Sequence, residues 1–300
     1  MNLLLTGSNG FLGSYFIDKY SSIYNISKFS FLNDSFEDLN LKDINTIVHL
    51  SALVHQMGGA SAEEYERVNV TQTLELAKKA KASGVQHFIF MSTVKVYGEE
   101  TDVAYTENSV CKPEDEYGKS KLKAEKALQK LDDDSFRVSI IRTPIVYGYG
   151  VKANIKNLVN LVNKVPVLPF AGIDNKRSMV YIGNLCYLID TIIDKRQSGV
   201  FLAADDEPLS TTKLIQMIAS ALDKKLYLVK IPFFENALKL LKPSFHKRLY
   251  GSLEVDNRLT MKTLFGEARV NNAISKYSLE ATLPYSVEDG IKFMIHGETK

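Results

Sequence analysis

The chain has 300 residues, of which 45% are hydrophobic, and carries a formal net charge of +2. This length supports a large core in one or two domains, and the near-neutral charge argues against a nucleic acid or a membrane surface as partner. No apolar stretch approaches the roughly 20 residues that span a bilayer, and no secretory leader is recognisable, so we expect a cytoplasmic protein. Two cysteines, Cys111 and Cys186, suit a reducing compartment, and five scattered histidines predict no metal site.

Strands and helices are predicted to alternate through the first 147 residues. They are a strand at 3–5, a helix at 14–20, strands at 28–32 and 46–52, a helix at 68–82, a strand at 87–92, a helix at 115–131 and a strand at 137–142. This alternation predicts a Rossmann-like doubly wound α/β fold, with a parallel sheet covered by helices on both faces. Between Leu32 and Thr46 the chain is too short for another helix and strand, so one βα unit is expected to be trimmed.

Beyond residue 148 the alternation breaks up, and six prolines punctuate shorter elements. We therefore expect a smaller C-terminal substrate-binding lobe. The predicted division is a dinucleotide-binding domain at 1–147 and a lobe at 148–300, with part of 177–198 packing back on the first domain.

A glycine-rich turn, TGSNGFLG, joins the first predicted strand to the first helix. In a dinucleotide-binding turn, Gly7 permits the tight bend, Gly10 lets the backbone approach a pyrophosphate, and Gly13 lets the helix pack closely on the sheet. The amides at the helix N-terminus then attract the anion. The first two glycines are one residue further apart than in G-x-G-x-x-G, and an ordinary glycine-rich turn is the alternative.

Tyr117 and Lys121 lie four residues apart in the predicted helix 115–131, so their side chains share a face. A cation close to a phenol lowers the tyrosine pKa from about 10 towards the working pH, which makes the side chain usable as a general acid or base. Such pairs also occur by chance on amphipathic surface helices. Here Thr93, at the end of a predicted strand, and the glycine-rich turn belong to the sheet edge where these folds bind ligands.

The order of these motifs resembles that of the extended short-chain dehydrogenase/reductases, in particular the nucleotide-sugar epimerase/dehydratase group. The resemblance covers nearly the whole chain. The matching segments are TGSNGFLG (6–13), HLSA (49–52), Asn69 in VNVTQT, MSTVKVYG (91–98), YGKSK (117–121), RTPIVYG (142–148) and RSMVYIGNL (177–185).

The resemblance implies a catalytic triad of Thr93, Tyr117 and Lys121. Thr93 would hydrogen-bond the substrate oxygen, and Tyr117 would transfer the proton. Lys121 would lower the tyrosine pKa and hold the nicotinamide ribose. The hydride chemistry would belong to a bound NAD or NADP. A strand-end hydroxyl that caps the next turn is the structural alternative for Thr93.

The resemblance also implies a set of cofactor-binding residues. Asn69 matches a helix residue that organises the strand ends, although a plain buried asparagine is an alternative. Residues 144–146 match the wall beside the nicotinamide, although core packing explains them equally well. The predicted set is Gly7, Asn9, Gly10, Phe11, Leu12, Gly13, Asn33, Leu50, Ser51, Ala52, Asn69, Ser92, Tyr117, Lys121, Pro144 and Val146.

The stretch after the second predicted strand bears on the choice of cofactor. An acidic residue there accepts from the ribose 2′-hydroxyl of NAD, whereas an arginine binds the 2′-phosphate of NADP. Asn33 and Asp34 follow this strand, and no arginine lies nearby. NAD is therefore favoured, although Lys28 leaves NADP open.

Arg177 and Arg248 resemble two arginines that contact the nucleotide diphosphate in this group. The planar guanidinium pairs phosphate oxygens bidentately, and a solvated surface charge is the alternative for each. We therefore expect a UDP-sugar as substrate, and a homodimer is possible. The predicted substrate-binding residues are Thr93, Lys95, Asn154, Arg177 and Arg248.

The segments VYGYGVKANIKNLVNLV and PVLPFAGIDNKRSMVYIGNL resemble one subgroup, which includes reductases of UDP-2-acetamido-2,6-dideoxy-4-keto-hexoses in bacterial surface-polysaccharide synthesis, often labelled as UDP-glucose 4-epimerases. Dehydratases carry an Asp-Glu pair where this chain has Val94 and Lys95, and valine cannot transfer a proton. We therefore expect 4-keto reduction, with UDP-hexose 4-epimerisation as the alternative. A non-catalytic dinucleotide-binding regulator is disfavoured because all three triad residues are present.

Overall fold

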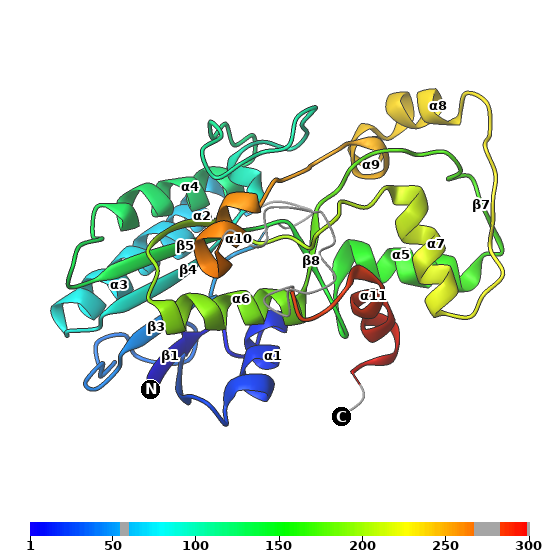
Figure 1. Ribbon diagram of the computed structural model, residues 1–300. Helices are drawn as coiled ribbons and strands as arrows, with labels where there is room; N and C mark the ends of the chain where they lie inside the picture. Colours follow the sequence, from blue (N-terminus) through cyan, green and yellow to red (C-terminus); the bar gives the residue numbers. More distant parts are fainter. Residues whose placement is uncertain (55–59, 267–282, 299–300) are drawn as a thin grey trace.

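A six-stranded parallel sheet forms the centre of the N-terminal part of the protein (Figure 1). The computed structural model describes residues 1–54, 60–266 and 283–298. The strand order is β2-β1-β3-β4-β5-β9, and every neighbouring pair is parallel. The strands are β1 (Asn2–Thr6), β2 (Asn25–Phe29), β3 (Thr46–His49), β4 (His87–Thr93), β5 (Arg137–Thr143) and β9 (Gly199–Leu202). This confirms the predicted Rossmann-like sheet, whose strand order turns back between β1 and β3, where such folds bind ligands.

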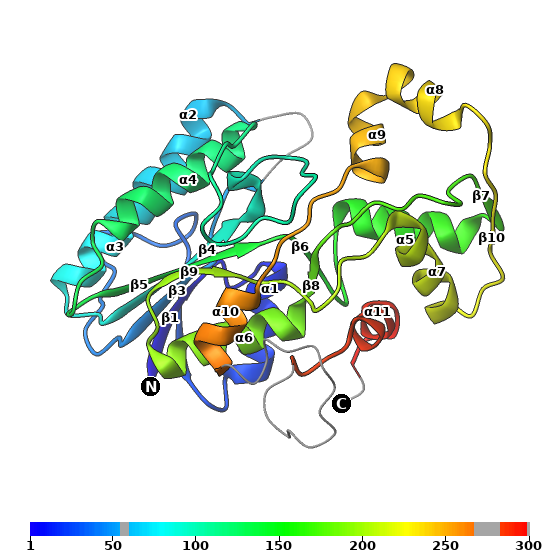
Figure 2. The same cartoon turned by 45° about the horizontal axis from the view of Figure 1, so that its top comes forward.

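Alternate residues of each strand build two cores, one on each face of the sheet. The covering helices are α1 (Phe11–Tyr20), α3 (Gln72–Ala82), α4 (Glu116–Gln129) and α6 (Ile182–Lys195). Leu3 and Leu5 share a core with α1 and α6, whereas Leu4 packs with α3 and α4 on the opposite face (Figure 2). Successive strand residues point to opposite faces, so a strand buried on both sides reads as one continuous apolar run.

The helix predicted at 68–82 begins earlier than expected. It runs as α2 (Ala62–Tyr65), a π-helical turn (Glu66–Thr71) and then α3. Ser61 caps its start in a capping box with Glu64: the Ser61 hydroxyl accepts from the Glu64 amide, and the Glu64 carboxylate accepts from the Ser61 amide. These reciprocal bonds satisfy two of the free N–H groups at the helix start.

The second strand was predicted at 28–32 but spans Asn25–Phe29, so its prediction was wrong by three residues. This edge strand exposes Lys28, and the apolar Leu32, on which the prediction partly depended, is 93% exposed in a turn. No helix or strand lies within residues 30–45, which agrees with the expected trimming of one βα unit. As a result, β2 has no neighbour on its outer side among the described residues.

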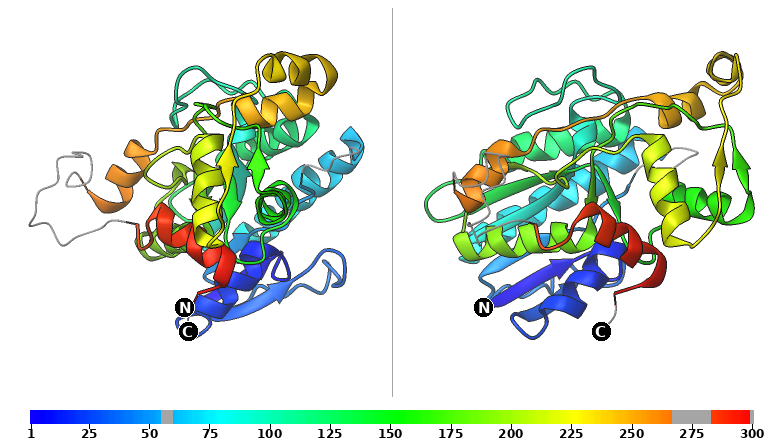
Figure 3. Two further views of the ribbon diagram at one scale, coloured as in Figure 1. Left: turned by 90° about the vertical axis from the view of Figure 1, so that its right-hand side faces the viewer. Right: turned by 45° about the vertical axis from the view of Figure 1, so that its right-hand side comes forward.

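The C-terminal part of the chain forms a smaller lobe beside the carboxyl ends of the strands (Figures 1 and 3). Its helices include α5 (Ala153–Lys164), α7 (Thr211–Ala221), α8 (Phe234–Leu241), α9 (Pro243–Tyr250) and α11 (Val287–His296). Two short parallel pairs complete it, β6 (Ile145–Tyr147) with β8 (Met179–Tyr181) and β7 (Val167–Leu168) with β10 (Tyr227–Leu228). Between these parts the chain returns to the sheet as α6 and β9, against which α10 (Arg258–Phe265) packs. The domain division at residue 147 stays a prediction.

Candidate active site

The glycine-rich turn connects β1 to α1 in a space that excludes side chains. Gly7 has φ of 69°, and a Cβ there would lie 2.9 Å from the backbone of Leu50 and Ser51. A Cβ on Gly13 would lie 2.3 Å from the Gly7 carbonyl oxygen. The exposed Gly10 precedes the first residue of α1, and its amide donates to the same oxygen over 3.0 Å. The turn thus lets a ligand approach the helix amides, as a dinucleotide pyrophosphate requires.

His49 is a buried histidine that joins β1, β3 and α3 beneath this turn. It was not singled out by itself in the sequence. Its Nδ1 bonds Thr6 Oγ1 over 2.8 Å, and its Nε2 bonds Thr73 Oγ1 over 3.0 Å. Thr6 Oγ1 also accepts from the Ser51 amide. Burial, with a contribution from Lys121, lowers the pKa of His49 to about 3. His49 is therefore a neutral connector that holds the predicted cofactor segment 50–52 against the turn.

Asn69 connects the end of β3 to the start of α4. Its side chain accepts from the Leu53 amide over 2.8 Å and donates to the Leu53 carbonyl and to Ser120 Oγ, both over 3.0 Å. The Ser120 hydroxyl donates in turn to the Tyr117 carbonyl. Asn69 is fully buried and lies in the π-helical turn, a local distortion that is frequent at functional sites.

The three predicted catalytic residues come from two adjacent elements, β4 and α4. Thr93 ends β4, and its Oγ1 accepts from the Lys95 amide over 3.3 Å. This is the turn-capping bond that was the structural alternative to a catalytic role for Thr93. The hydroxyl proton is not used in this bond, so Thr93 can still donate to a ligand. Tyr117 and Lys121 lie in the first half of α4, which packs along β4.

Lys121 does not lower the pKa of Tyr117 as predicted. Burial raises the phenol pKa, and Asp115 and Tyr65 raise it further. The Lys121 ammonium instead donates to the Met91 carbonyl over 2.8 Å. Spacing along the helix places the two side chains on one face, but the neighbouring strand β4 determines where the ammonium points.

The buried Lys121 is expected to destabilise the ligand-free protein. Burial lowers its pKa from the ordinary 10.5 to about 7. Between these values the unfolded chain binds more protons, so this contribution to stability rises with pH. Lys121→Met should therefore raise the free energy of unfolding at pH 7 by about 1–3 kcal/mol and flatten its pH dependence above pH 7. Urea titrations at several pH values measure both effects.

The exposed Lys119, on the same helix, provides the matched control. Lys119→Met should leave both the stability and its pH dependence nearly unchanged. A loss of stability at pH 7 in Lys121→Met alone would show that the Met91 hydrogen bond outweighs the cost of burying the amine.

A buried ion pair, not predicted from the sequence, fixes α4 against the sheet. Arg142 Nη2 lies 2.6 Å from Glu125 Oε2, with side-chain exposures of 6% and 1%. Arg142 Nη1 also donates to the Tyr97 hydroxyl over 2.7 Å. Ser92, predicted to bind cofactor, donates its hydroxyl to Glu125 instead. This network positions the helix that carries Tyr117 and Lys121.

Asn33 lies further from the sheet than predicted, because β2 ends at Phe29. Its amide donates to the Ser30 carbonyl in an exposed turn. The neighbouring Asp34 folds back, and its Oδ2 accepts from the Ser30 amide over 2.8 Å. This bond puts a carboxylate at the carboxyl end of β2, where an acid would accept from the ribose 2′-hydroxyl of NAD. Asp34 is therefore a better candidate than Asn33 for this contact.

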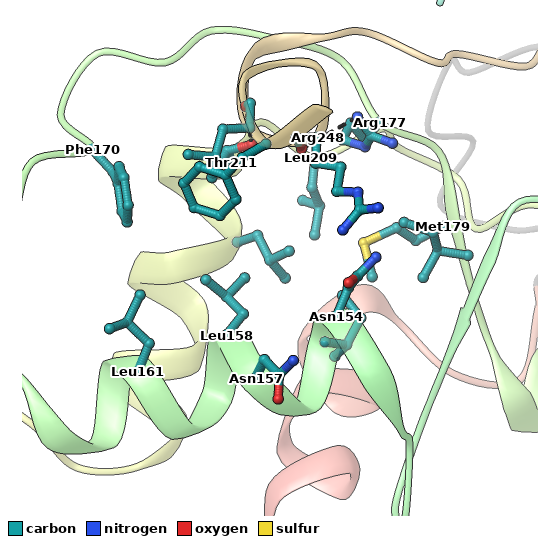
Figure 4. A pocket seen from close by; sticks show the side chains of 15 residues that line it. Asn154, Asn157, Leu158, Leu161, Phe170, Arg177, Met179, Leu209, Thr211 and Arg248 are labelled. Carbon is teal, nitrogen blue, oxygen red and sulfur yellow. Dashed lines mark hydrogen bonds between the residues drawn. The ribbon is translucent and has the colours of Figure 1, made fainter. Parts of the chain in front are cut away.

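A cavity of about 330 Å³ lies in the lobe, and its lining includes none of the three triad residues. Thr93 pairs in register with Thr143 of β5, and Ile145, two residues further along, lines the cavity. Figure 4 shows Arg177, Arg248 and Asn154 together at one end. The remaining lining is largely apolar: Ile145, Ile155, Leu158, Leu161, Phe170, Met179, Leu209, Leu214, Phe245 and Leu249, with Asn157 and Thr211.

Two predicted substrate-binding residues also have structural partners. Arg177 Nη1 donates to the Gly251 carbonyl over 2.9 Å, just beyond the C-terminus of α9. Burial lowers the pKa of Arg177. Lys95 Nζ pairs with Asp115 at 2.6 Å and Glu99 at 2.8 Å, outside the residues that line the cavity.

The last predicted positions also lie around this edge. Phe11 and Leu12 begin α1, half-buried, and Asn9 is exposed in the turn before it. Pro144 is buried between β5 and β6, and Val146 pairs with Val180 of β8. The turn, the triad and the wall 144–146 thus lie together at the carboxyl ends of the parallel strands. The two arginines belong to the adjoining lobe.

The parallel sheet, and the glycine-rich turn and triad at the carboxyl ends of its strands, are those of a dinucleotide-binding enzyme. The chain belongs to the NAD dependent epimerase/dehydratase family, whose model matches residues 3–203. It is 41% identical over 296 residues to a UDP-glucose 4-epimerase of Vibrio cholerae, with 88% of this chain and 89% of the relative covered. This agrees with the predicted family and with its nicotinamide cofactor.

Solved structures show the same fold. The UDP-N-acetylglucosamine 4-epimerase of Bacillus cereus matches with a TM-score of 0.75 at 17% identity, covering 100% of both chains. A dTDP-4-dehydrorhamnose reductase of Clostridium acetobutylicum matches with a TM-score of 0.74 at 18% identity, covering 99% of both chains. Epimerases and a reductase thus share this architecture, so the fold alone does not separate the two reactions.

Proposed function

We propose that this protein reduces the 4-keto group of a UDP-2-acetamido-2,6-dideoxy-hexose. The observation that carries the sugar-nucleotide assignment is the pair of guanidinium side chains, Arg177 and Arg248, at one end of a largely apolar cavity. Guanidinium groups suit a diphosphate, and the apolar walls suit ring faces and a 6-deoxy carbon. The proximity of Ile145 to the register pair Thr93–Thr143 supports access of a sugar carbon to the triad.

In this proposal Gly7 and Gly13 shape the turn, Gly10 and the amides at the start of α1 hold the dinucleotide pyrophosphate, and Asp34 accepts from the adenosine ribose. The bound cofactor supplies the hydride. Thr93 donates a hydrogen bond to the 4-keto oxygen, and Tyr117 gives its proton to that oxygen as the alcohol forms. Valine at position 94 supplies no acid for the loss of a hydroxyl group, so the sugar keeps its other substituents.

The choice of reduction over epimerisation is supported by the resemblance of the segments around Lys95 and residues 151–154 to the keto-reductase subgroup.

UDP-hexose 4-epimerisation is the second candidate. It uses the same three residues twice, with the keto sugar turning in the cavity between the two hydride steps. The name of the Vibrio cholerae relative favours it.

The retained cofactor distinguishes the two candidates. Purified protein is passed over a desalting column, denatured, and its released dinucleotide is quantified. The reductase proposal predicts little retained dinucleotide and no interconversion of UDP-N-acetylglucosamine with its C4 epimer. Stoichiometric retained NAD together with such interconversion would establish the epimerase instead.

Arg177→Ala should weaken the binding of free UDP and of the UDP-sugar equally, because the contact is to the diphosphate. The expected loss is about 1.5–3 kcal/mol for a charge-assisted hydrogen bond, measured by titration calorimetry. Since Arg177 also bonds the carbonyl after α9, Arg177→Lys serves as the paired variant: it keeps a charge and a donor while losing the planar fork. An unchanged UDP affinity in Arg177→Ala would remove this residue from the site.

A further inference from the structure

The helix pair α8 and α9 lies at the outer tip of the lobe (Figure 3). Several large apolar side chains of this pair are exposed. No residue of α8 is buried. Three large apolar side chains are the most exposed: Phe233 at 83%, Leu240 at 81% and Leu241 at 75%. Phe233 has φ of 61°, a left-handed conformation that is rare for a bulky residue.

An apolar groove adjoins this surface. It has a volume of about 340 Å³ and is lined by Phe234, Ala237, Leu238, Leu241, Lys242 and Phe245. Phe245 also lines the substrate cavity, so the two spaces are neighbours. Contiguous exposed apolar side chains of this kind mark a surface that interacts with a partner.

The charge around the surface indicates which partner. Residues 233–250 contain Lys239, Lys242 and Lys247 besides Arg248 of the substrate cavity, and a single acidic residue, Glu235, although the whole chain has a net charge of only +2. A helix with Phe and Leu on one side and lysines beside them is typical of segments that lie in the headgroup region of a bilayer. Two copies of this chain joined through the same surface would instead bring like charges together.

We propose that α8 and α9 dock on an anionic lipid bilayer, with Phe233, Leu240 and Leu241 entering the headgroup region and the neighbouring lysines facing lipid phosphates. The earlier expectation of no membrane partner used the overall charge, which conceals this local concentration. Within the described residues, no helix is long and apolar enough to cross a membrane, so the contact is one of surface docking. It would bring the wall of the substrate cavity at Phe245 close to the bilayer.

Cosedimentation of the full chain with vesicles tests the proposal. We expect binding to vesicles of phosphatidylcholine with phosphatidylglycerol, weak binding to phosphatidylcholine alone, and a loss of binding as salt is raised. Phe233→Ser/Leu240→Ser should weaken binding about tenfold, and Lys239→Glu/Lys242→Glu should do the same on anionic vesicles. None of these four residues lines the substrate cavity, so turnover of a water-soluble substrate should stay unchanged.

Leu32→Ser/Val103→Ser is the matched control, because both side chains are highly exposed, at 93% and 76%, in other parts of the molecule. It should bind vesicles as the parent does. Three results would each overturn the proposal: a parent protein that stays in the supernatant, equal binding to neutral and anionic vesicles, and a parent dimer that Phe233→Ser/Leu240→Ser converts to monomer without any vesicle binding.

Discussion

Tyr117→Phe is expected to lower turnover by about 100- to 10,000-fold while leaving the affinity for the dinucleotide nearly unchanged. The phenylalanine ring keeps the shape of the side chain but has no proton to give to the sugar oxygen. No hydrogen bond of the Tyr117 hydroxyl within the described residues supports the fold, so the loss should appear in the reaction and not in stability. Steady-state rates on a verified substrate and a dinucleotide titration measure the two effects separately.

Tyr65 offers a matched control, because its ring lies 6.2 Å from that of Tyr117 and its hydroxyl donates to the Val54 carbonyl. Tyr65→Phe removes an equivalent hydroxyl without touching the proposed proton donor, and its effect on turnover should be less than about tenfold. If Tyr117→Phe keeps more than about half of the native rate, Tyr117 is not the proton donor.

Arg142→Leu is expected to destabilise the protein by about 3–5 kcal/mol, since it leaves the Glu125 carboxylate buried without its charged partner. Both side chains are almost fully buried, so water cannot replace the lost interaction. Activity should fall as well, because Glu125 belongs to the helix that carries Tyr117 and Lys121. Urea unfolding of the purified variant gives the change in free energy.

The double variant Glu125→Leu/Arg142→Leu distinguishes pairing from packing. Removing both charges should recover a large part of the lost stability, because no uncompensated charge stays buried. A double variant that is as unstable as the sum of the two single variants would mean that the ion pair itself is not what Arg142 contributes.

Much of the sheet could be predicted because its central strands are buried on both faces and read as apolar runs, as at Leu3–Leu5. The edge strand β2 was misplaced because Asn25, Ser27 and Lys28 are exposed, while apolar Leu32 belongs to a turn. The start of the helix at Ala62 was missed although the Ser61 and Glu64 capping box is a local signal that can be read from the sequence.

The chemistry of the site was harder to predict from the sequence, because it depends on partners that are distant in the chain. Spacing places Tyr117 and Lys121 on one face, but it does not show that the Lys121 ammonium bonds the Met91 carbonyl. In the same way, motif matching identifies Arg177 but not its hydrogen bond to the Gly251 carbonyl. No local sequence pattern predicts that Glu125 pairs with Arg142. Such pairings come from tertiary packing.

The transfer of deuterium from a labelled cofactor to the sugar tests the central proposal most directly. The protein is incubated with NADH carrying deuterium at C4 of the nicotinamide, on the face from which hydride leaves, together with UDP-2-acetamido-2,6-dideoxy-4-keto-hexose; NADPH labelled in the same way is the parallel sample. We predict that one deuterium appears at C4 of a 4-hydroxy product for each reduced cofactor consumed, and that Tyr117→Phe abolishes most of this transfer. An unlabelled sugar, with no loss of reduced cofactor but with UDP-N-acetylglucosamine converted to its C4 epimer, would contradict the reductase proposal.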